Sequence, residues 1–141
     1  MQTFYTSKQI NELRMAAQFY KLDAPKEFWN KTATELKRCC NGAGAECWRD
    51  SKRYALTSAL KLYEAPIMVH DVDYEYQSVT KQQADKRLKD NMLKVWRKHY
   101  GFWRWFKRSA RVERIIVIPA VYAAVVLGGD SAWKETKSKR Q

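Results

Sequence analysis

Hydrophobic residues recur every three or four positions along most of the chain, which is the spacing of amphipathic helices. The first such stripe begins after Ser7, which can cap a helix, and ends near Leu22. A second stripe runs from Pro25, a residue suited to a first helical turn, into Cys40. The N-terminal part of the chain is therefore predicted to form two helices.

The centre of the chain contains a glycine-rich loop followed by two further helical stripes. Two glycines within residues 41–45 predict the loop, because they favour unusual backbone angles. The next stripe covers residues 54–77, where Pro66 should kink the helix or mark its true beginning. Thr80 and Gln83 form a capping-box pattern before the following stripe. Only a short polar connection separates these two helices, so an all-α fold with an antiparallel pair is expected.

The C-terminal part combines one strongly apolar run with a basic tail. The run, Ile115 to Gly129, has 15 residues and contains Pro119, whereas a membrane-spanning helix needs about 20 apolar residues. A buried hairpin or core segment is the first interpretation, and shallow membrane insertion competes with it. Residues 134–141 are expected to form a disordered basic tail behind a single helical domain, residues 1–133. The first twenty residues lack the continuous apolar stretch of a secretory signal, so neither a signal peptide nor a full membrane span is expected.

One pair of helical stripes carries a candidate for catalysis. His70 and Tyr74 are four residues apart and share a helix face, while Asp85 lies on the apolar stripe of the following helix. A carboxylate that faces a core is costly unless it is paired, and the His70 ring and the Tyr74 hydroxyl are the available partners. The sequence therefore predicts an Asp85–His70 hydrogen bond supported by Tyr74. Such a bond fixes the imidazole tautomer and leaves the other ring nitrogen free to deprotonate water.

The neighbour of His70 offers a possible cation ligand. Asp71 is displaced by about 100° around the helix from His70 and could bind a hard cation. Calcium prefers about six to eight oxygen ligands, including backbone carbonyls. Glycines at alternate positions of the loop at residues 41–45 would let successive carbonyls turn the same way.

Taken in order, these motifs resemble the phospholipase A2 superfamily in its compact bacterial, phage and parvoviral forms. Those enzymes pair a glycine-rich calcium loop with a His-Asp-x-x-Tyr helix and an antiparallel helix that carries a further Asp. The resemblance covers about residues 38–94, and Asp73 stands where secreted members carry a cysteine. The matching residues are Cys40-Asn41-Gly42-Ala43-Gly44, His70-Asp71-x-x-Tyr74 and Ala84-Asp85.

The resemblance implies a calcium-dependent enzyme that hydrolyses the sn-2 ester of membrane phospholipids. His70 would be the general base, and Tyr74 and Asp85 would orient it. The implied Ca²⁺ ligands are the carboxylate of Asp71 and the carbonyl groups of Cys40, Gly42 and Gly44. A bacterial or phage origin is also implied by the resemblance alone.

The charge of the chain points to a polyanionic partner. Its 141 residues include 27 Lys and Arg against 15 Asp and Glu, a formal net charge of +12. The excess increases along the chain, from +2 in residues 1–50 (8 − 6) to +4 in residues 51–100 (10 − 6) and +6 in residues 101–141 (9 − 3). An anionic lipid surface and a nucleic acid would both be attracted to this charge.

Residues 96–108 mix aromatic and basic side chains densely, and three interpretations are open for them. They could seat the protein on an anionic phospholipid membrane. They could instead stack on bases and neutralise a nucleic-acid backbone. In the third interpretation the aromatic rings pack beneath the catalytic pair and only the basic groups reach solvent.

A second hypothesis of function therefore remains beside the phospholipase. In it the protein is a non-catalytic basic helical module that binds nucleic acid or a partner protein, and the His70-Asp71 motif is structural. The membrane is the preferred partner because no recognised nucleic-acid-binding motif accompanies the charge.

Overall fold

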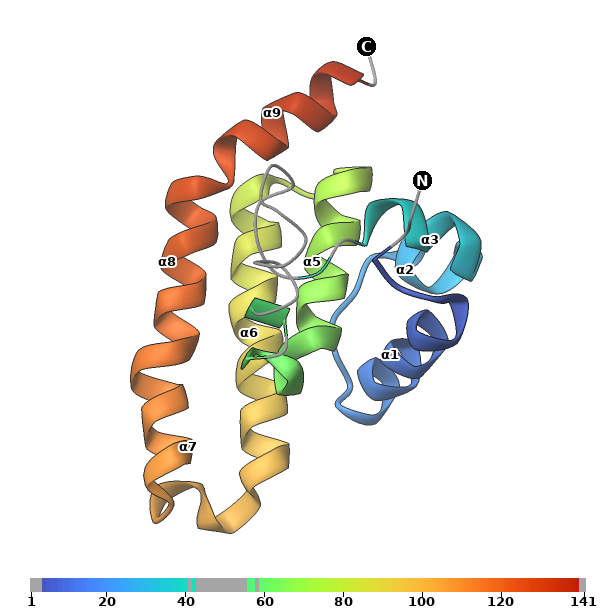
Figure 1. Ribbon diagram of the computed structural model, residues 1–141. Coiled ribbons are helices and arrows are strands. Elements are labelled where there is room, and N and C mark those ends of the chain that lie inside the picture. Colours follow the sequence, from blue (N-terminus) through green and yellow to red (C-terminus); the bar gives the residue numbers. More distant parts are fainter. Residues whose placement is uncertain (1–3, 41, 43–55, 58, 140–141) are drawn as a thin grey trace.

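All regular secondary structure in the described residues of this chain is helical (Figure 1). The computed structural model describes residues 4–40, 42, 56–57 and 59–139. Helices connected by short turns make up nearly all of these residues. The predicted all-α fold class is confirmed.

Two antiparallel helices form the centre of the molecule (Figure 1). Helix α5 spans Glu64–Tyr76 after a 3₁₀ turn, η1, at Lys61–Tyr63, and α6 spans Lys81–Tyr100. Helix α5 begins two residues before Pro66, so the proline lies in the first turn, where its missing N–H costs no helical hydrogen bond. The capping box of Thr80 and Gln83 is present at the start of α6, as predicted.

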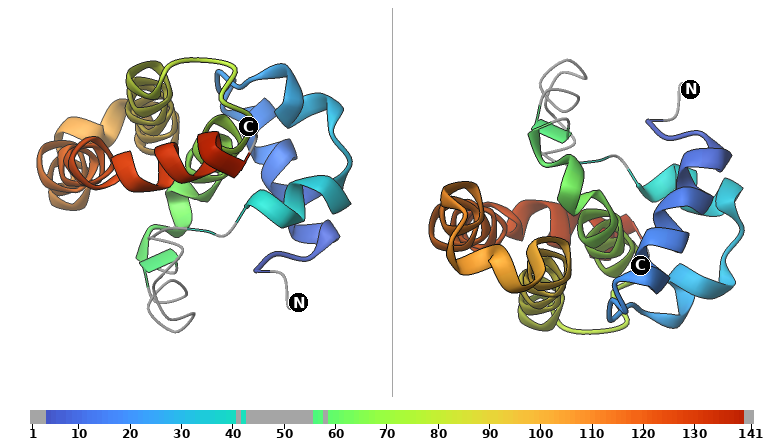
Figure 2. Two further views of the ribbon diagram at one scale, coloured as in Figure 1. Left: turned by 90° about the horizontal axis from the view of Figure 1, so that it is seen from above. Right: turned by 90° about the horizontal axis from the view of Figure 1, so that it is seen from below.

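Three short helices cover one side of α5 (Figures 1 and 2). They are α1 at Ser7–Phe19, α2 at Lys26–Asn30 and α3 at Ala33–Cys39. The predicted start and end of the first helix were each slightly wrong. Thr6 rather than Ser7 is its N-cap, and the helix ends before Leu22 because Lys21 adopts a left-handed backbone conformation, φ 53°.

The single helix expected from Pro25 to Cys40 is divided into α2 and α3. Thr32 is extended and accepts a hydrogen bond from the backbone N–H of Glu35, and the Glu35 side chain accepts one from the backbone N–H of Thr32. This capping box starts a new helix within the continuous apolar stripe. A strong local cap therefore overrode the helical periodicity.

A long helical rod lies along α6 on its side away from α1 (Figures 1 and 2). It consists of α7, Arg108–Val112, a π-helical turn η3, Glu113–Val117, and α8, Ile118–Gly128. Helix α9, Asp130–Lys139, follows after a bend of 51° and packs on α5.

Two expectations for this C-terminal part were wrong. The apolar run from Ile115 is neither a buried hairpin nor a wholly buried core segment, because it is helical and Ile118 is the one buried side chain of α8, while Val121 and Val125 pack partly buried against the core. The tail that was expected to be disordered from residue 134 is helical to Lys139. In the described part of the chain no single helix has the length and apolar character to cross a membrane, although the bent pair 108–128 and 130–139 meets that test together.

The core lies between the central pair and the helices on either side of it. The indole Nε1 of Trp96 donates to the carbonyl of Ala110 at 2.8 Å, which attaches α6 to the rod through a buried polar contact. The largest fully buried apolar side chains of the core are Trp96, Phe28, Ile10, Leu36, Met68, Met92 and Ile118.

A buried ion pair joins the central helices. Asp73 of α5 is fully buried, and the Arg87 guanidinium of α6 donates to its carboxylate at 2.5 Å. A second nitrogen of Arg87 contacts Asp23 at 2.9 Å. Burial raises the pKa of Asp73, and the charge of Arg87 and its hydrogen bond oppose that rise. Removal of Arg87 would therefore leave the Asp73 carboxylate in the core without its partner.

Candidate active site

The central helices bring the predicted catalytic residues together. His70 projects from α5 and Asp85 from α6, and the His70 Nε2 lies 2.9 Å from the Asp85 Oδ1. The Tyr74 hydroxyl, one turn after His70, donates to the same oxygen at 2.8 Å. His70 is 8% exposed and Asp85 is 2% exposed. The predicted hydrogen bonds are confirmed, and their role in catalysis stays a prediction.

The ionisation of Asp85 determines which histidine nitrogen is basic. Burial alone would raise the pKa of Asp85, but hydrogen bonds from His70, Lys81 and Tyr74 outweigh it and lower the pKa. The group is therefore a carboxylate, which can only accept hydrogen bonds. It follows that Nε2 of His70 carries the hydrogen toward Asp85 and that Nδ1 carries the lone pair of the neutral ring.

Lys81 is a member of this cluster that the sequence analysis missed. Its ammonium group donates to the Asp85 Oδ2 at 2.7 Å and to the carbonyl oxygens of Val125 and Val126 at 3.1 and 3.3 Å. It also lies 3.4 Å from the carboxylate of Asp130. The four-residue spacing of Lys81 and Asp85 was a usable signal, but nothing local to them predicts the contact with the end of α8.

The corner between α8 and α9 covers Tyr74. The ring of Trp133 stands edge-on to that of Tyr74, with centroids 5.0 Å apart, and the Trp133 carbonyl accepts a hydrogen bond from the Gln77 amide at 2.7 Å. Gly129 lies so near that a Cβ atom there would overlap the Tyr74 hydroxyl. The C-terminal helices thus contribute to the surroundings of the hydrogen-bonded pair of His70 and Asp85, here called the dyad. The order of the motifs in the sequence did not indicate this contribution.

Alanine at position 129 is expected to destabilise the fold by about 1–3 kcal/mol, because its methyl group would displace the Tyr74 hydroxyl and meet the Val125 carbonyl. Gly128→Ala is the matched control, since no atom lies within 4 Å of a Cβ atom there. Urea denaturation of both variants measures the difference. Equal midpoints would mean that Gly129 is not packed against Tyr74.

Acidification provides a second test of the Asp85 environment. The pKa of Asp85 is lower in the folded protein than in the unfolded chain, where a carboxyl group has a pKa of about 3.9. The resulting stabilisation is complete at a pH above the unfolded-state pKa and is lost as the pH falls through the folded-state pKa. Wild-type protein should therefore lose more unfolding free energy than Asp85→Asn between about pH 5 and pH 2. Denaturant titrations at several pH values give the unfolding free energy of each protein as a function of pH. If Asp85 were not stabilised as its anion, the two plots would be parallel.

The described part of the predicted calcium loop, Cys40 and Gly42, directly follows α3. Cys40 is buried, and hydrogen bonding with Cys39, burial and the negative charge of Asp71 raise the pKa of the Cys40 thiol. Gly42 has a φ of 77°, and a Cβ atom there would meet the Phe4 ring and the Thr57 hydroxyl. Gly44 is outside the described residues.

The predicted ligands fit a hard cation in their donor types, since they combine one carboxylate with backbone carbonyls. Within the residues that the structure places, no three His, Cys, Asp or Glu side chains cluster as metal ligands. A site made mainly of backbone carbonyls does not require such a cluster.

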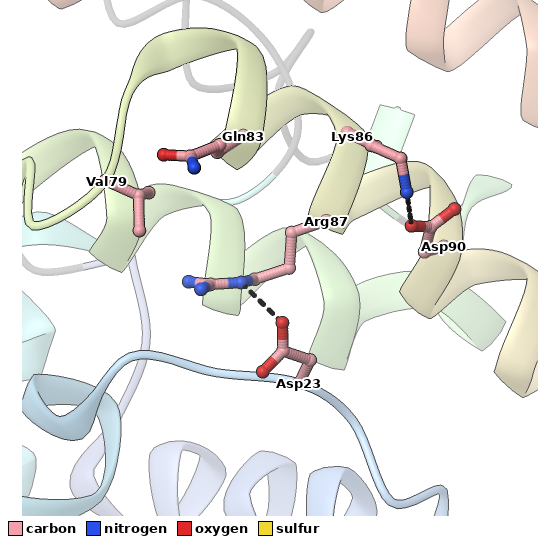
Figure 3. A pocket seen from close by; sticks show the side chains of 6 residues that line it. All are labelled: Asp23, Val79, Gln83, Lys86, Arg87 and Asp90. Carbon is pink, nitrogen blue, oxygen red and sulfur yellow. Dashed lines mark hydrogen bonds and ion pairs between the residues drawn. The ribbon is translucent and has the colours of Figure 1, made fainter.

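A surface hollow on α6 is separate from the dyad. Figure 3 shows Arg87 directed at Asp23 and Lys86 paired with Asp90, with Val79 and Gln83 completing its lining. These α6 positions face away from Lys81 and Asp85, by the 100° step of a helix. The hollow therefore does not reach the atoms of the candidate active site.

The aromatic segment 96–108 does not lie beneath the dyad. Trp96 is buried near the far end of α6, and the later aromatics of the segment, Phe102, Trp103, Trp105 and Phe106, are exposed. The interpretation in which these rings pack under the catalytic pair is therefore wrong for the four exposed ones.

No protein-family model matches the sequence, and neither the curated proteins nor the solved structures include a significant match.

Proposed function

We propose that the protein hydrolyses a carboxylic ester of a phospholipid, at the sn-2 position, with His70 as the general base. The observation that carries the proposal is the buried hydrogen bond between His70 Nε2 and an ionised Asp85, which the Tyr74 hydroxyl also contacts. Buried carboxylate–histidine pairs of this kind prepare the second ring nitrogen to accept a proton.

The steps follow from the tautomer. Nδ1 of His70 takes a proton from water as the water oxygen attacks the ester carbonyl carbon. Asp85 keeps the Nε2 hydrogen bond and stabilises the imidazolium that forms. The imidazolium then returns the proton to the departing alkoxide oxygen, so that a fatty acid and a lysophospholipid leave and the histidine is neutral again.

Calcium belongs to the same proposal. Asp71 and the carbonyls of Cys40, Gly42 and Gly44 would hold Ca²⁺, and a bound Ca²⁺ supplies a positive charge opposite the oxyanion of the tetrahedral intermediate. The left-handed backbone of Gly42 supports this ligand set.

The test is release of fatty acid from mixed phosphatidylcholine and phosphatidylglycerol vesicles, with Ca²⁺ or with EDTA. His70→Ala is expected to lower the rate by at least about a hundred-fold, since general-base catalysis is worth about 10²–10⁴. His99→Ala, at an exposed position in the last turn of α6, is the control and should retain wild-type activity. Undiminished, calcium-dependent release by His70→Ala protein would overturn the assignment.

A further inference from the structure

Four large aromatic side chains form an exposed knob at the end of α6. Gly101, with φ 53°, ends the helix and leads into the 3₁₀ turn η2, Gly101–Trp105. Phe102, Trp103, Trp105 and Phe106 are each between 60% and 75% exposed. Side chains of this size usually lie in a core, so such a group of them marks a contact surface.

An apolar stripe continues from this aromatic knob along the outer side of the rod. Ile115 and Leu127 are 70% and 82% exposed, and Val112, Ile116 and Val126 are exposed as well. With the exposed Pro119, Ala120 and Ala123, these positions lie on the solvent side of the rod, away from the buried Ile118. The stripe therefore extends over about four helical turns, roughly 22 Å at 1.5 Å per residue.

Basic residues surround the aromatic knob without any acidic neighbour in the sequence. Residues 91–112 contain seven Lys and Arg and no Asp or Glu. Arg97, Lys98, Lys107, Arg108 and Arg111 among them are exposed. Glu113, the next acid along the chain, accepts hydrogen bonds from the Tyr63 and Tyr100 hydroxyls.

The positive charge and the apolar stripe together favour one kind of binding partner for this surface. A second copy of the chain would bring two clusters of positive charge together, which is unfavourable. A nucleic acid would match the cations but would leave the aliphatic stripe in water. The surface of an anionic bilayer accommodates both, because aromatic rings and aliphatic side chains enter the interface while Lys and Arg contact lipid phosphates.

We propose that the aromatic knob and the apolar stripe of α7 and α8 form a docking surface for an anionic lipid bilayer. This inference names the surface that would bring the proposed enzyme to its lipid, and to that extent it rests on the proposed function. Its evidence is nevertheless independent of the dyad, so binding and hydrolysis can fail separately.

The experiment is sedimentation of the full chain with phosphatidylcholine vesicles that contain phosphatidylglycerol, in EDTA so that hydrolysis is not needed. Wild-type protein should bind these vesicles and should bind pure phosphatidylcholine far more weakly. Trp103→Ser with Phe106→Ser should weaken binding roughly ten-fold or more, as should Lys107→Glu with Arg108→Glu. Ile116→Ser with Leu127→Ser tests the stripe and should weaken binding less.

Matched controls change exposed residues of the N-terminal helices, on the other side of the molecule (Figure 2). Met15→Ser removes a side chain that is 68% exposed, and Lys8→Glu with Lys26→Glu makes the same charge change as the basic variant; both should bind as wild type does.

Three results would overturn the proposal. They are wild-type protein that does not sediment with anionic vesicles, knob variants that bind as tightly as wild type, and knob-dependent binding of duplex DNA or self-association in place of vesicle binding. Vesicle binding without ester hydrolysis would overturn the proposed enzyme alone and leave the docking surface intact.

Discussion

Asparagine at position 85 is expected to slow ester hydrolysis by about a hundred-fold or more while the helices stay folded. A neutral amide cannot stabilise the imidazolium that forms on His70. Both oxygens of Asp85 accept hydrogen bonds, one from His70 and Tyr74 and the other from Lys81. The NH₂ group of an asparagine can only donate, so it would face donors in either orientation of the amide. Initial rates on vesicles and far-UV circular dichroism together measure the effect.

The matched control is Asp90→Asn, which removes a half-exposed carboxylate from the same helix and should leave the rate unchanged. Lys81→Met provides a further distinction. In the Asp85→Asn background it should cost less unfolding free energy than in the wild-type background, since a donor facing the amide is removed together with the contacts to the Val125 and Val126 carbonyls, and it should not restore the rate. Recovery of the rate would mean that Asp85 acts only on stability.

Arg87→Ala is expected to lower the unfolding free energy by about 3–5 kcal/mol, because it leaves the Asp73 carboxylate buried without its partner. Lys86→Ala removes the neighbouring cation, whose pair with Asp90 is exposed, and should cost no more than about 0.5 kcal/mol. Urea denaturation near neutral pH compares the two.

A second substitution tests whether the unpaired charge of Asp73 causes the loss of unfolding free energy. Asp73→Asn in the Arg87→Ala protein should recover part of the lost free energy, since burying an amide is less unfavourable than burying an unpaired charge. If the double variant were no more stable than Arg87→Ala, the loss would come from the packing of the arginine stem instead.

Much of the central pair was predictable because its determinants are local or periodic. The Thr80 capping box, the proline in the first turn of α5 and the inward position of Asp85 each follow from spacing along one helix. The hydrogen bonds of the dyad then follow because a buried carboxylate requires partners and His70 and Tyr74 share one face.

The contributions of distant segments were not predictable in this way. Lys81 contacts the end of α8 across 44 residues of sequence, and no local pattern encodes that contact. The exposure of α8 was missed because a continuous apolar run looks the same whether one face or all faces are buried. The restart of the helix at Thr32 was encoded, but the continuous stripe around it concealed the cap.

The length of α6 has a consequence for how the protein would lie on a bilayer. Asp85 stands near its beginning and the aromatic knob begins after its last residue, so about 16 residues, or roughly 24 Å of helix, separate the two ends. With α6 perpendicular to the membrane and only the knob inserted, His70 would remain far above the head groups. Hydrolysis at the surface would therefore require the axis of α6 to lie nearly parallel to the bilayer, and only in such an orientation can the apolar stripe contact lipid along its whole length.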